Sequence, residues 1–196
     1  MSHPLKRNIE NTIGQTLPDE VFNSFSKFLF EKSFDKKYLL AEEGKICKYL
    51  YFIEEGSCYS YIVNEKGDKH ALQFALEGYW ISDLYSFFSG KPAIYNIETL
   101  EPVTAFMLNV DSFDELCNTH HLFDHFFRIL IQNAYVRMQY RLAKTNSEEA
   151  MNRYREFSEL HPDFIERIPQ YLIASYLGIK PQSLSRIRTE MMQKKK

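Results

Sequence analysis

The spacing of apolar residues changes twice along the chain and divides it into three regions. Over residues 18–31, apolar side chains recur at three- and four-residue intervals and predict a helix with one apolar face: Val21, Phe22, Phe25, Phe28 and Leu29. Pro18 suits the first turn of this helix, and the two acids after it suit the positive end of its dipole. From about residue 37 to 110, short apolar runs alternate with glycine-containing turns, which indicates an all-β sandwich, roll or barrel.

Three glycines mark turns within this β region. The stretch "NEKGD" is typical of a hairpin turn at Gly67. Gly44 and Gly56 each follow two acids at the end of an apolar run, where a turn residue with positive φ is expected.

After residue 110 the helical period returns, first in "DSFDELCNTH" and then over residues 120–143. The longer helix has two apolar stripes. One consists of Phe123, Phe127, Leu130 and Ala134, and the other of Phe126, Ile129, Asn133, Val136 and Tyr140. Because a helix that is apolar on two faces must bury both, one stripe can cover the β region while the other needs a partner. The second stripe has coiled-coil spacing, so we expect the same helix of a second subunit there, with Asn133 fixing the register; the alternative is a helix buried inside one monomer.

The stretch "KTNSEEAMNRY" predicts a break after the long helix. Thr145 and Glu148 have the spacing of a capping box, and Ser147 is a second candidate cap for a new helix. This joint contains neither proline nor glycine, so we expect it to be short and stiff.

Residues 168–191, "IPQYLIASYLGIKPQSLSRIRTEM", have the pattern of a helix-turn-helix. The first helix spans residues 170–177, with apolar Leu172, Ile173, Tyr176 and Leu177, and Ala174 lets a second helix cross closely. Gly178 ends it in a left-handed turn, and Ile179 is an apolar anchor within that turn. Pro181 suits the first turn of the second helix, whose Leu184 and Ile187 face inward.

The outward residues of the second helix suit DNA. They are Gln182, Ser183, Ser185, Arg186 and Arg188. Arginine can donate two hydrogen bonds to guanine, glutamine can pair with adenine, and serine can bond bases or phosphates. Lys180 and the terminal Lys194, Lys195 and Lys196 would contact phosphates. The alternative is a structural helical hairpin with a solvated face.

Charge is unevenly distributed along the chain. Residues 161–196 hold seven Lys and Arg against three Asp and Glu, whereas the whole chain has a net charge of −2. A basic end on an acidic body favours an anionic partner, although a solvated surface would give the same balance. No apolar run approaches the roughly 20 residues that span a bilayer. The N-terminal stretch lacks the apolar segment of a secretory signal, so we expect a cytoplasmic protein without membrane contact.

Metal, disulfide and catalytic chemistry find little support in the sequence. Cys47, Cys58 and Cys117 are far apart and form neither a CxxC motif nor a Cys/His cluster. His121 and His125 have the i, i+4 spacing of metal ligands, but no third ligand accompanies them. We expect neither an enzyme nor a metal site.

The order of these regions resembles the cyclic-AMP receptor protein and fumarate–nitrate regulator (Crp/Fnr) superfamily of bacterial transcription factors. The matches are "YLLAEEGKICKYLYFIEEGSCYSYIV" and "RIPQYLIASYLGIKPQSLSRIR", and the second is similar to members from the Bacteroidetes. The resemblance, over residues 18–191, implies an α+β chain. It would comprise a jelly-roll (double-stranded β-helix) domain at 1–119, a dimerisation helix and hinge at 120–145, and a winged-helix-like helix-turn-helix domain at 146–196. It further implies a homodimer that binds a double-stranded DNA operator and allows RNA polymerase as a further partner. The alternative is a small-molecule-sensing module that acts through protein contacts.

The resemblance also suggests roles for residues of the second helix. Arg186 stands where the family has a guanine-reading arginine, and Ser183 where a hydroxyl residue touches the DNA backbone. Gln182 replaces a glutamate that reads cytosine, and Pro181 replaces another arginine, so one contact is missing. The segment "FIERIPQ" resembles the start of the family's wing.

Residues 78–96, "GYWISDLYSFFSGKPAIYN", stand where cyclic-nucleotide-binding members have their phosphate cassette. Its effector-pocket positions here are Gly78, Ser82, Asp83, Leu84, Ala93 and Ile94. Asp83 replaces the ribose-binding glutamate, and Ala93 and Ile94 replace the Arg-Ser pair that binds the cyclic phosphate. Losing such a buried pair costs about 3–5 kcal/mol, so we expect no cyclic-AMP binding and no cofactor. The site would hold an unidentified, less charged small molecule, or be filled by Trp80, Phe87, Phe88 and Tyr95.

Overall fold

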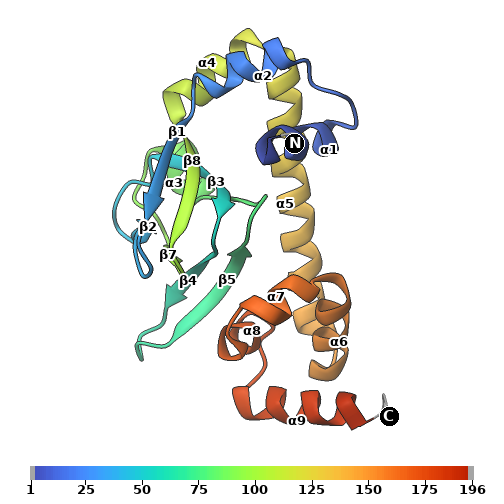
Figure 1. Cartoon of the computed structure of the whole chain (residues 1–196). Coiled ribbons are helices and arrows are strands. Elements are labelled where there is room, and N and C mark those ends of the chain that lie inside the picture. The colour runs from blue at the N-terminus through green and yellow to red at the C-terminus, as the bar shows by residue number, and fades with distance from the viewer. Residues whose placement is uncertain (1–2, 194–196) are drawn as a thin grey trace. The chain divides into compact units, whose positions relative to one another are not determined.

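The computed structural model describes the chain from His3 to Gln193, apart from the side chain of Asn146 (Figure 1). Its contacts group into two compact units, which we describe separately. The first unit joins residues up to 60 with residues 74–135, and the second joins residues 61–73 with residues from 136 onward.

The strands form two four-stranded sheets, in the orders β1–β8–β3–β6 and β2–β7–β4–β5. Their bounds are β1 Phe30–Phe34, β2 Leu39–Ala41, β3 Tyr49–Glu55, β4 Cys58–Val63, β5 Lys69–Ala75, β6 Trp80–Ile81, β7 Asn96–Thr99 and β8 Val103–Asn109. The pairs β1–β8, β3–β8, β3–β6 and β2–β7 run antiparallel. This arrangement confirms the predicted α+β class with a jelly-roll.

Strand β3 explains why the sequence "YLYFI" is apolar at every position. Tyr51 and Ile53 face the interior of the roll, where they pack in one core cluster with Met107 of β8. The alternate residues Leu50 and Phe52 lie in a second cluster on the opposite face of the sheet. A strand that is buried on both faces reads as a continuous apolar run rather than as an alternating one.

Helices cover the outer face of this sheet. They are α1 Pro4–Ile13, α2 Asp19–Ser26, α4 Val110–Thr119 and the first half of α5 His121–Ser147. Leu5 and Ile9 of α1 are fully buried in the core cluster between these helices and the sheet. No helix was predicted there. The helix predicted for 18–31 is shorter than expected, because α2 ends at Ser26 and the chain enters β1 at Phe30.

The glycine turns have the predicted backbone conformation. Gly44, Gly56 and Gly67 all have φ between 83° and 91°. At Gly56 a side chain would also be excluded by space, because a Cβ atom would lie 2.2 Å from the carbonyl oxygen of Pro102. The chain therefore needs glycine where β3 turns into β4.

The long helix α5 changes character along its length. Phe123, Phe126 and Phe127 are at most 1% exposed and belong to the helical core cluster of the first unit. In the second half, Val136, Met138 and Leu142 are each more than half exposed. The prediction that Phe126 lies in a dimer interface is therefore wrong, because its own chain buries it completely. The alternative of a helix buried along its whole length inside one monomer is also wrong, because the second half is exposed. No helix in the described part of the chain is long and apolar enough to cross a membrane.

The remaining elements of the second unit are helices: α6 Ala150–Leu160, α7 Pro162–Arg167, α8 Gln170–Tyr176 and α9 Pro181–Gln193. The predicted capping box is wrong, because α5 continues to Ser147 and the Thr145 hydroxyl donates to the carbonyl of Arg141 at 2.9 Å. The next helix begins only at Ala150. The segment "FIERIPQ" does not start a wing either, because Phe164–Arg167 lie within helix α7.

Candidate functional site

Helices α8 and α9 form the predicted helix-turn-helix. Gly178 takes the left-handed conformation with φ 64°, and the Ile179 N–H donates to the Ala174 carbonyl at 2.8 Å, which closes the end of α8. Pro181 is the first residue of α9. Ala174 is fully buried, as expected for a small residue where two helices cross. The prediction is confirmed at both helices and at the turn.

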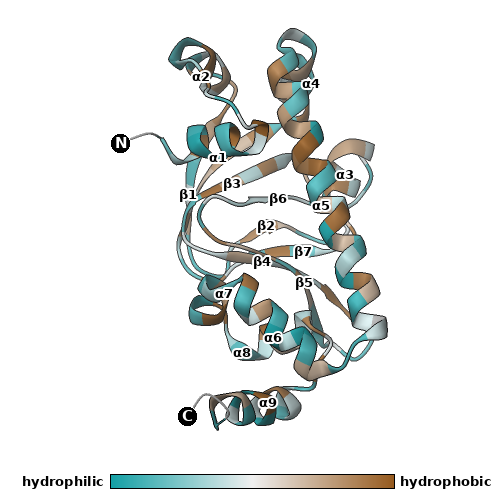
Figure 2. Ribbon diagram, turned by 90° about the vertical axis from the view of Figure 1, so that its right-hand side faces the viewer, coloured by the Kyte–Doolittle hydropathy of each residue, from teal (hydrophilic) through white to brown (hydrophobic). Residues whose placement is uncertain are grey.

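Helix α9 has one apolar and one polar face, and both colours appear along it in Figure 2. Leu184 and Ile187 are only 2% and 6% exposed. They are buried within the second unit, which also contains the buried Ile173 of α8. The opposite face leaves Gln182, Ser185 and Arg186 exposed to solvent. The fold therefore presents a glutamine, a serine and a guanidinium side by side on a firmly packed helix.

The other predicted DNA-binding residues lie around this face. Lys180, in the turn before α9, is exposed, whereas Ser183 and Arg188 are half-buried along the sides of the helix. Lys194, Lys195 and Lys196 lie outside the described residues. Thr189 is exposed on the same face as Arg186, and it is not among the residues predicted to bind DNA. Its position three residues after Arg186 was the signal that could have found it.

Two arginines fasten the turn of the helix-turn-helix to the preceding helices. Arg153 of α6 donates to the Leu177 carbonyl at 3.0 Å, and Arg141 of α5 donates to the Tyr176 carbonyl at 3.3 Å. The Arg141 guanidinium also lies over the Tyr176 ring, 4.6 Å from its centroid. Cations at the C-terminal end of a helix are favoured by the helix dipole. Helices α5 and α6 thus set the position of α8 and, through the turn, of α9.

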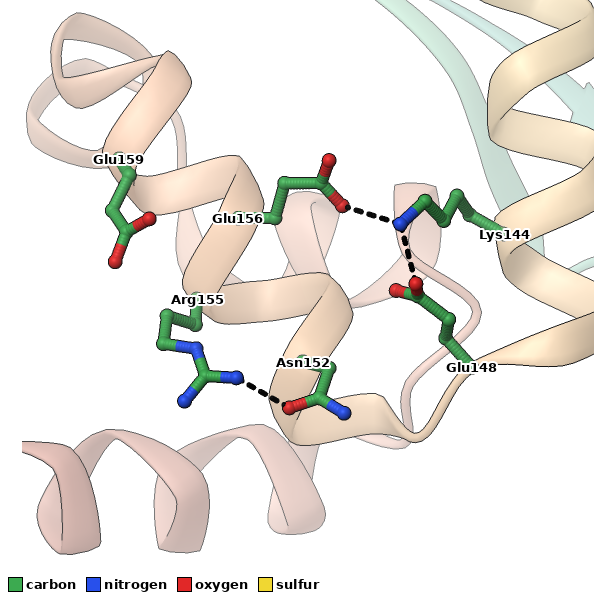
Figure 3. A pocket seen from close by; sticks show the side chains of 6 residues that line it. All are labelled: Lys144, Glu148, Asn152, Arg155, Glu156 and Glu159. Atoms are coloured by element: carbon green, nitrogen blue, oxygen red, sulfur yellow. Dashed lines mark hydrogen bonds and ion pairs between the residues drawn. The ribbon is translucent and has the colours of Figure 1, made fainter.

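A polar pocket of about 260 Å³ lies at the joint between α5 and α6 (Figure 3). Lys144 forms ion pairs with Glu148 and, at 3.4 Å, with Glu156. The hydrogen bonds with Glu148 and Tyr140 raise the pKa of Lys144, and the hydrogen bond from Tyr140 lowers the pKa of Glu156. Because Lys144 is engaged by both carboxylates, these ion pairs hold the joint together rather than leave a free cation for a ligand.

In the roll, the cassette segment is closed by its own hydrogen bonds. Asp83 is fully buried at the start of helix α3, Leu84–Ser89. Its Oδ1 accepts from the Ser86 N–H at 2.9 Å, and its Oδ2 accepts from the Ile94 N–H at 2.8 Å. Both oxygens of the acid that stands at the expected ribose position are therefore held by backbone groups of the same segment.

The neighbouring cassette residues are also engaged. Ser82 donates to the Tyr49 carbonyl at 2.8 Å. Ala93 is buried, and its N–H donates to the Lys45 carbonyl at 2.8 Å while its carbonyl accepts from the Gly44 N–H at 2.9 Å. The other positions are a left-handed Gly78, a partly buried Leu84 and an exposed Ile94.

Of the four aromatic residues expected to fill the roll, one does so. Tyr95 packs against the roll core and donates from its hydroxyl to the Ser82 carbonyl at 2.8 Å. Burial, followed by the charge of Asp83, raises the pKa of Tyr95. Trp80 and Phe87 pack instead in the helical core cluster, and Phe88 is 46% exposed. The roll interior near Asp83 is thus filled by Tyr95 and its neighbours, whereas Trp80, Phe87 and Phe88 were wrongly placed there.

The histidines and thiols contribute no further site in the described part of the chain. His121 and His125 are exposed, and His125 lies 2.7 Å from the Arg128 guanidinium. No three His, Cys, Asp or Glu side chains among the described residues could hold a metal ion. Burial raises the pKa of the Cys58 thiol, and raises that of Cys117 to about 11, which disfavours the nucleophilic thiolate form of both.

Comparison with known proteins agrees with this architecture. Residues 31–120 match the cyclic nucleotide-binding domain family. FixK2 from Bradyrhizobium japonicum is similar in structure, with 16% identity, 85% of each chain covered and a TM-score of 0.69. The catabolite activator protein of Thermus thermophilus has 14% identity over 93% of this chain and 87% of that chain, with a TM-score of 0.60. A transcriptional regulator of the Crp/Fnr family from Eubacterium rectale has 12% identity over 91% and 85%, with a TM-score of 0.66.

By sequence, no curated protein matches this chain. The structural likeness covers nearly the whole chain at low identity, so it establishes the fold. The predicted resemblance is confirmed at that level, and the likeness to Bacteroidetes members stays a prediction. Residues 31–120 thus match the cyclic nucleotide-binding domain family, and the chain as a whole has the fold seen in the Crp/Fnr regulators.

Proposed function

We propose that the protein is a homodimeric transcription regulator of the cytoplasm that binds a specific double-stranded DNA sequence. The observation that carries this proposal is helix α9. Its apolar residues are buried in the second unit, while Gln182, Ser185 and Arg186 stand exposed together on its opposite side. A helix held in this way can enter the major groove, where these side chains match the hydrogen-bonding groups of bases.

Phosphate contacts come from the residues around this face. Lys180 lies at the start of α9, and Arg188 lies along its side. Cations beside a base-reading face fix its register on the duplex without reading sequence.

The homodimer is supported by helix α5. Half-buried Ile129 and exposed Asn133, Val136 and Tyr140 follow one stripe at coiled-coil spacing. Pairing these stripes about a two-fold axis would cover apolar surface and place two copies of α9 on one operator.

The roll is proposed to bind no cyclic nucleotide. Its cassette offers no cation at Ala93 or Ile94, and the carboxylate of Asp83 is already occupied by the Ser86 and Ile94 N–H groups. A cyclic phosphate placed there would lose hydration without gaining an ion pair. We propose no catalytic role and no cofactor for this chain, and any small-molecule effector would have a chemistry other than that of a cyclic nucleotide.

The test is selection of binding sites from a random duplex library, followed by titration of the selected duplex. We expect an inverted repeat. Arg186→Ala should weaken binding by about 1–3 kcal/mol and relax the preference at one base position. Arg7→Ala is the charge-matched control, because Arg7 is exposed in the first unit, and it should bind as the unchanged protein does.

The salt dependence of binding separates DNA recognition from a role in protein contacts. Affinity should fall steeply as salt rises, in proportion to the phosphates contacted. A folded protein that selects no sequence from the library would refute the proposed function.

A further inference from the structure

The exposed face of α9 contains a fourth residue. Gln182, Ser185, Arg186 and Thr189 are spaced by three, one and three residues, and all four are exposed. This spacing places them along one side of an α-helix. Homeodomain recognition helices read the major groove with residues at the same relative spacing. The side chain of Thr189 therefore continues the row of base-facing groups by one further helical turn.

The chemistry that Thr189 offers is set by its own hydrogen bond. Its hydroxyl donates to the Ser185 carbonyl at 3.1 Å, one turn earlier in the same helix. Because the only hydroxyl proton is engaged with the helix backbone, the hydroxyl cannot donate to a base, and the methyl group is the apolar contact that the side chain offers. In the major groove the complementary apolar group is the C5 methyl of thymine.

The half-buried residues of α9 have a different geometry. Ser183 and Arg188 lie along the sides of the helix, between the exposed face and the buried Leu184 and Ile187. From there they are suited to the phosphates that border the groove rather than to base edges. Thr189, in contrast, belongs to the central exposed row.

We propose that Thr189 is a specificity-determining residue that selects thymine through contact between the two methyl groups. The inference rests on the proposed DNA-binding function and deepens it. Three residues of helix advance by about 4.5 Å, which is close to one base-pair step. The selected thymine should therefore lie within about two base pairs of the position that Arg186 reads.

A matched pair of variants separates the methyl from the hydroxyl. Thr189→Ser keeps the hydroxyl and removes the methyl, whereas Thr189→Val keeps a methyl and removes the hydroxyl. Each is compared with the unchanged protein on the selected operator and on operators in which one thymine at a time is replaced by uracil, which lacks only the C5 methyl. Circular dichroism and thermal unfolding confirm that both variants are folded, as expected for an exposed position.

We expect one uracil position in each half-site to weaken the unchanged protein and Thr189→Val by about fourfold, the value for one buried methyl-sized group. Thr189→Ser should bind thymine and uracil operators equally at that position, while its preference at the Arg186 position is retained. The inference is overturned if Thr189→Ser keeps the thymine preference, if Thr189→Val loses it, or if no uracil within two base pairs of the Arg186 position has an effect. These results leave the proposed function intact, whereas an unchanged protein that selects no sequence would overturn both.

Discussion

The carboxylate of Asp83 has a structural role in the fold. The acid is fully buried, caps helix α3 through Ser86 and reaches across the segment to the Ile94 N–H. A carboxylate reserved for a ligand would have at least one oxygen free. Here both oxygens satisfy backbone groups that would otherwise be buried without partners.

Replacing Asp83 by Ala should therefore destabilise the first unit in the absence of any ligand. It removes a helix cap and a second buried hydrogen bond, which together are worth about 2–4 kcal/mol. Urea unfolding followed by Trp80 fluorescence measures this change. Trp80 is the single tryptophan of the chain and packs against Phe52 and Phe126 in the same unit.

Asn109→Ala is the matched control for this experiment. Asn109 caps α4 with one hydrogen bond, to the Ser112 N–H at 2.9 Å, so its loss should cost only about 1 kcal/mol. If Asp83→Ala were as stable as the unchanged protein or more so, the carboxylate would be held in a strained position for a ligand, and our interpretation of the cassette would be wrong.

Helix α5 carries apolar residues on more than one exposed side. Val136 and Tyr140 continue the predicted dimer stripe, while Met138 and Leu142 follow a second line of side chains. The exposed fractions of Val136 and Met138 are similar, at 56% and 53%. Exposure alone does not distinguish the two stripes, whereas the register of the coiled-coil pattern favours the first.

Val136→Glu should dissociate the dimer, and Met138→Glu should not. A glutamate in the seam places two like charges against each other across the two-fold axis and removes them from water, which costs several kcal/mol. The expected result is a monomer at micromolar concentration for Val136→Glu, measured by sedimentation equilibrium. The reverse outcome would move the interface to the second stripe, and a monomeric unchanged protein would contradict the homodimer.

The sequence predicted those elements whose pattern is decided locally. The helix-turn-helix was predicted at both helices because Gly178, Pro181 and the buried Leu184 each agree with the same backbone path. The β-roll was predicted because its turns need glycine and its strands are short. In these regions local and tertiary preferences coincide.

The errors occurred where tertiary packing decided the outcome. Helix α1 is short and has three apolar positions, Leu5, Ile9 and Ile13, whose role is clear only once they are seen to pack in the core of the first unit. Phe126 fits a coiled-coil seam by spacing, yet it packs beside Trp80 inside its own chain. Thr145 has the sequence spacing of a cap, but its hydroxyl bonds the preceding turn while α5 continues. The spacing of residues along the chain does not reveal which contacts they make in the folded protein.

The joint between α5 and α6 links the two proposed activities, dimerisation and DNA reading. Glu148 is held by Lys144, and the Glu148 carbonyl accepts from Arg153, which also bonds the Leu177 carbonyl. These contacts run within the second unit from α5 to the turn before α9. A joint fastened in this way should give the two recognition helices of a dimer a fixed separation.

Operator geometry tests that expectation. A two-fold dimer with fixed recognition helices requires half-sites about 34 Å apart on one face of the duplex. Inserting about five base pairs between the selected half-sites turns one of them by half a helical turn, and should reduce affinity to that of a single half-site. An insertion of about ten base pairs restores the face but adds about 34 Å, so it should not rescue binding. Fluorescence anisotropy titrations measure all three duplexes, with Val136→Glu as the control that should not distinguish them. Equal affinity of the unchanged protein for all three would mean that the two reading helices move independently, because only a flexible joint can follow half-sites that are rotated and displaced.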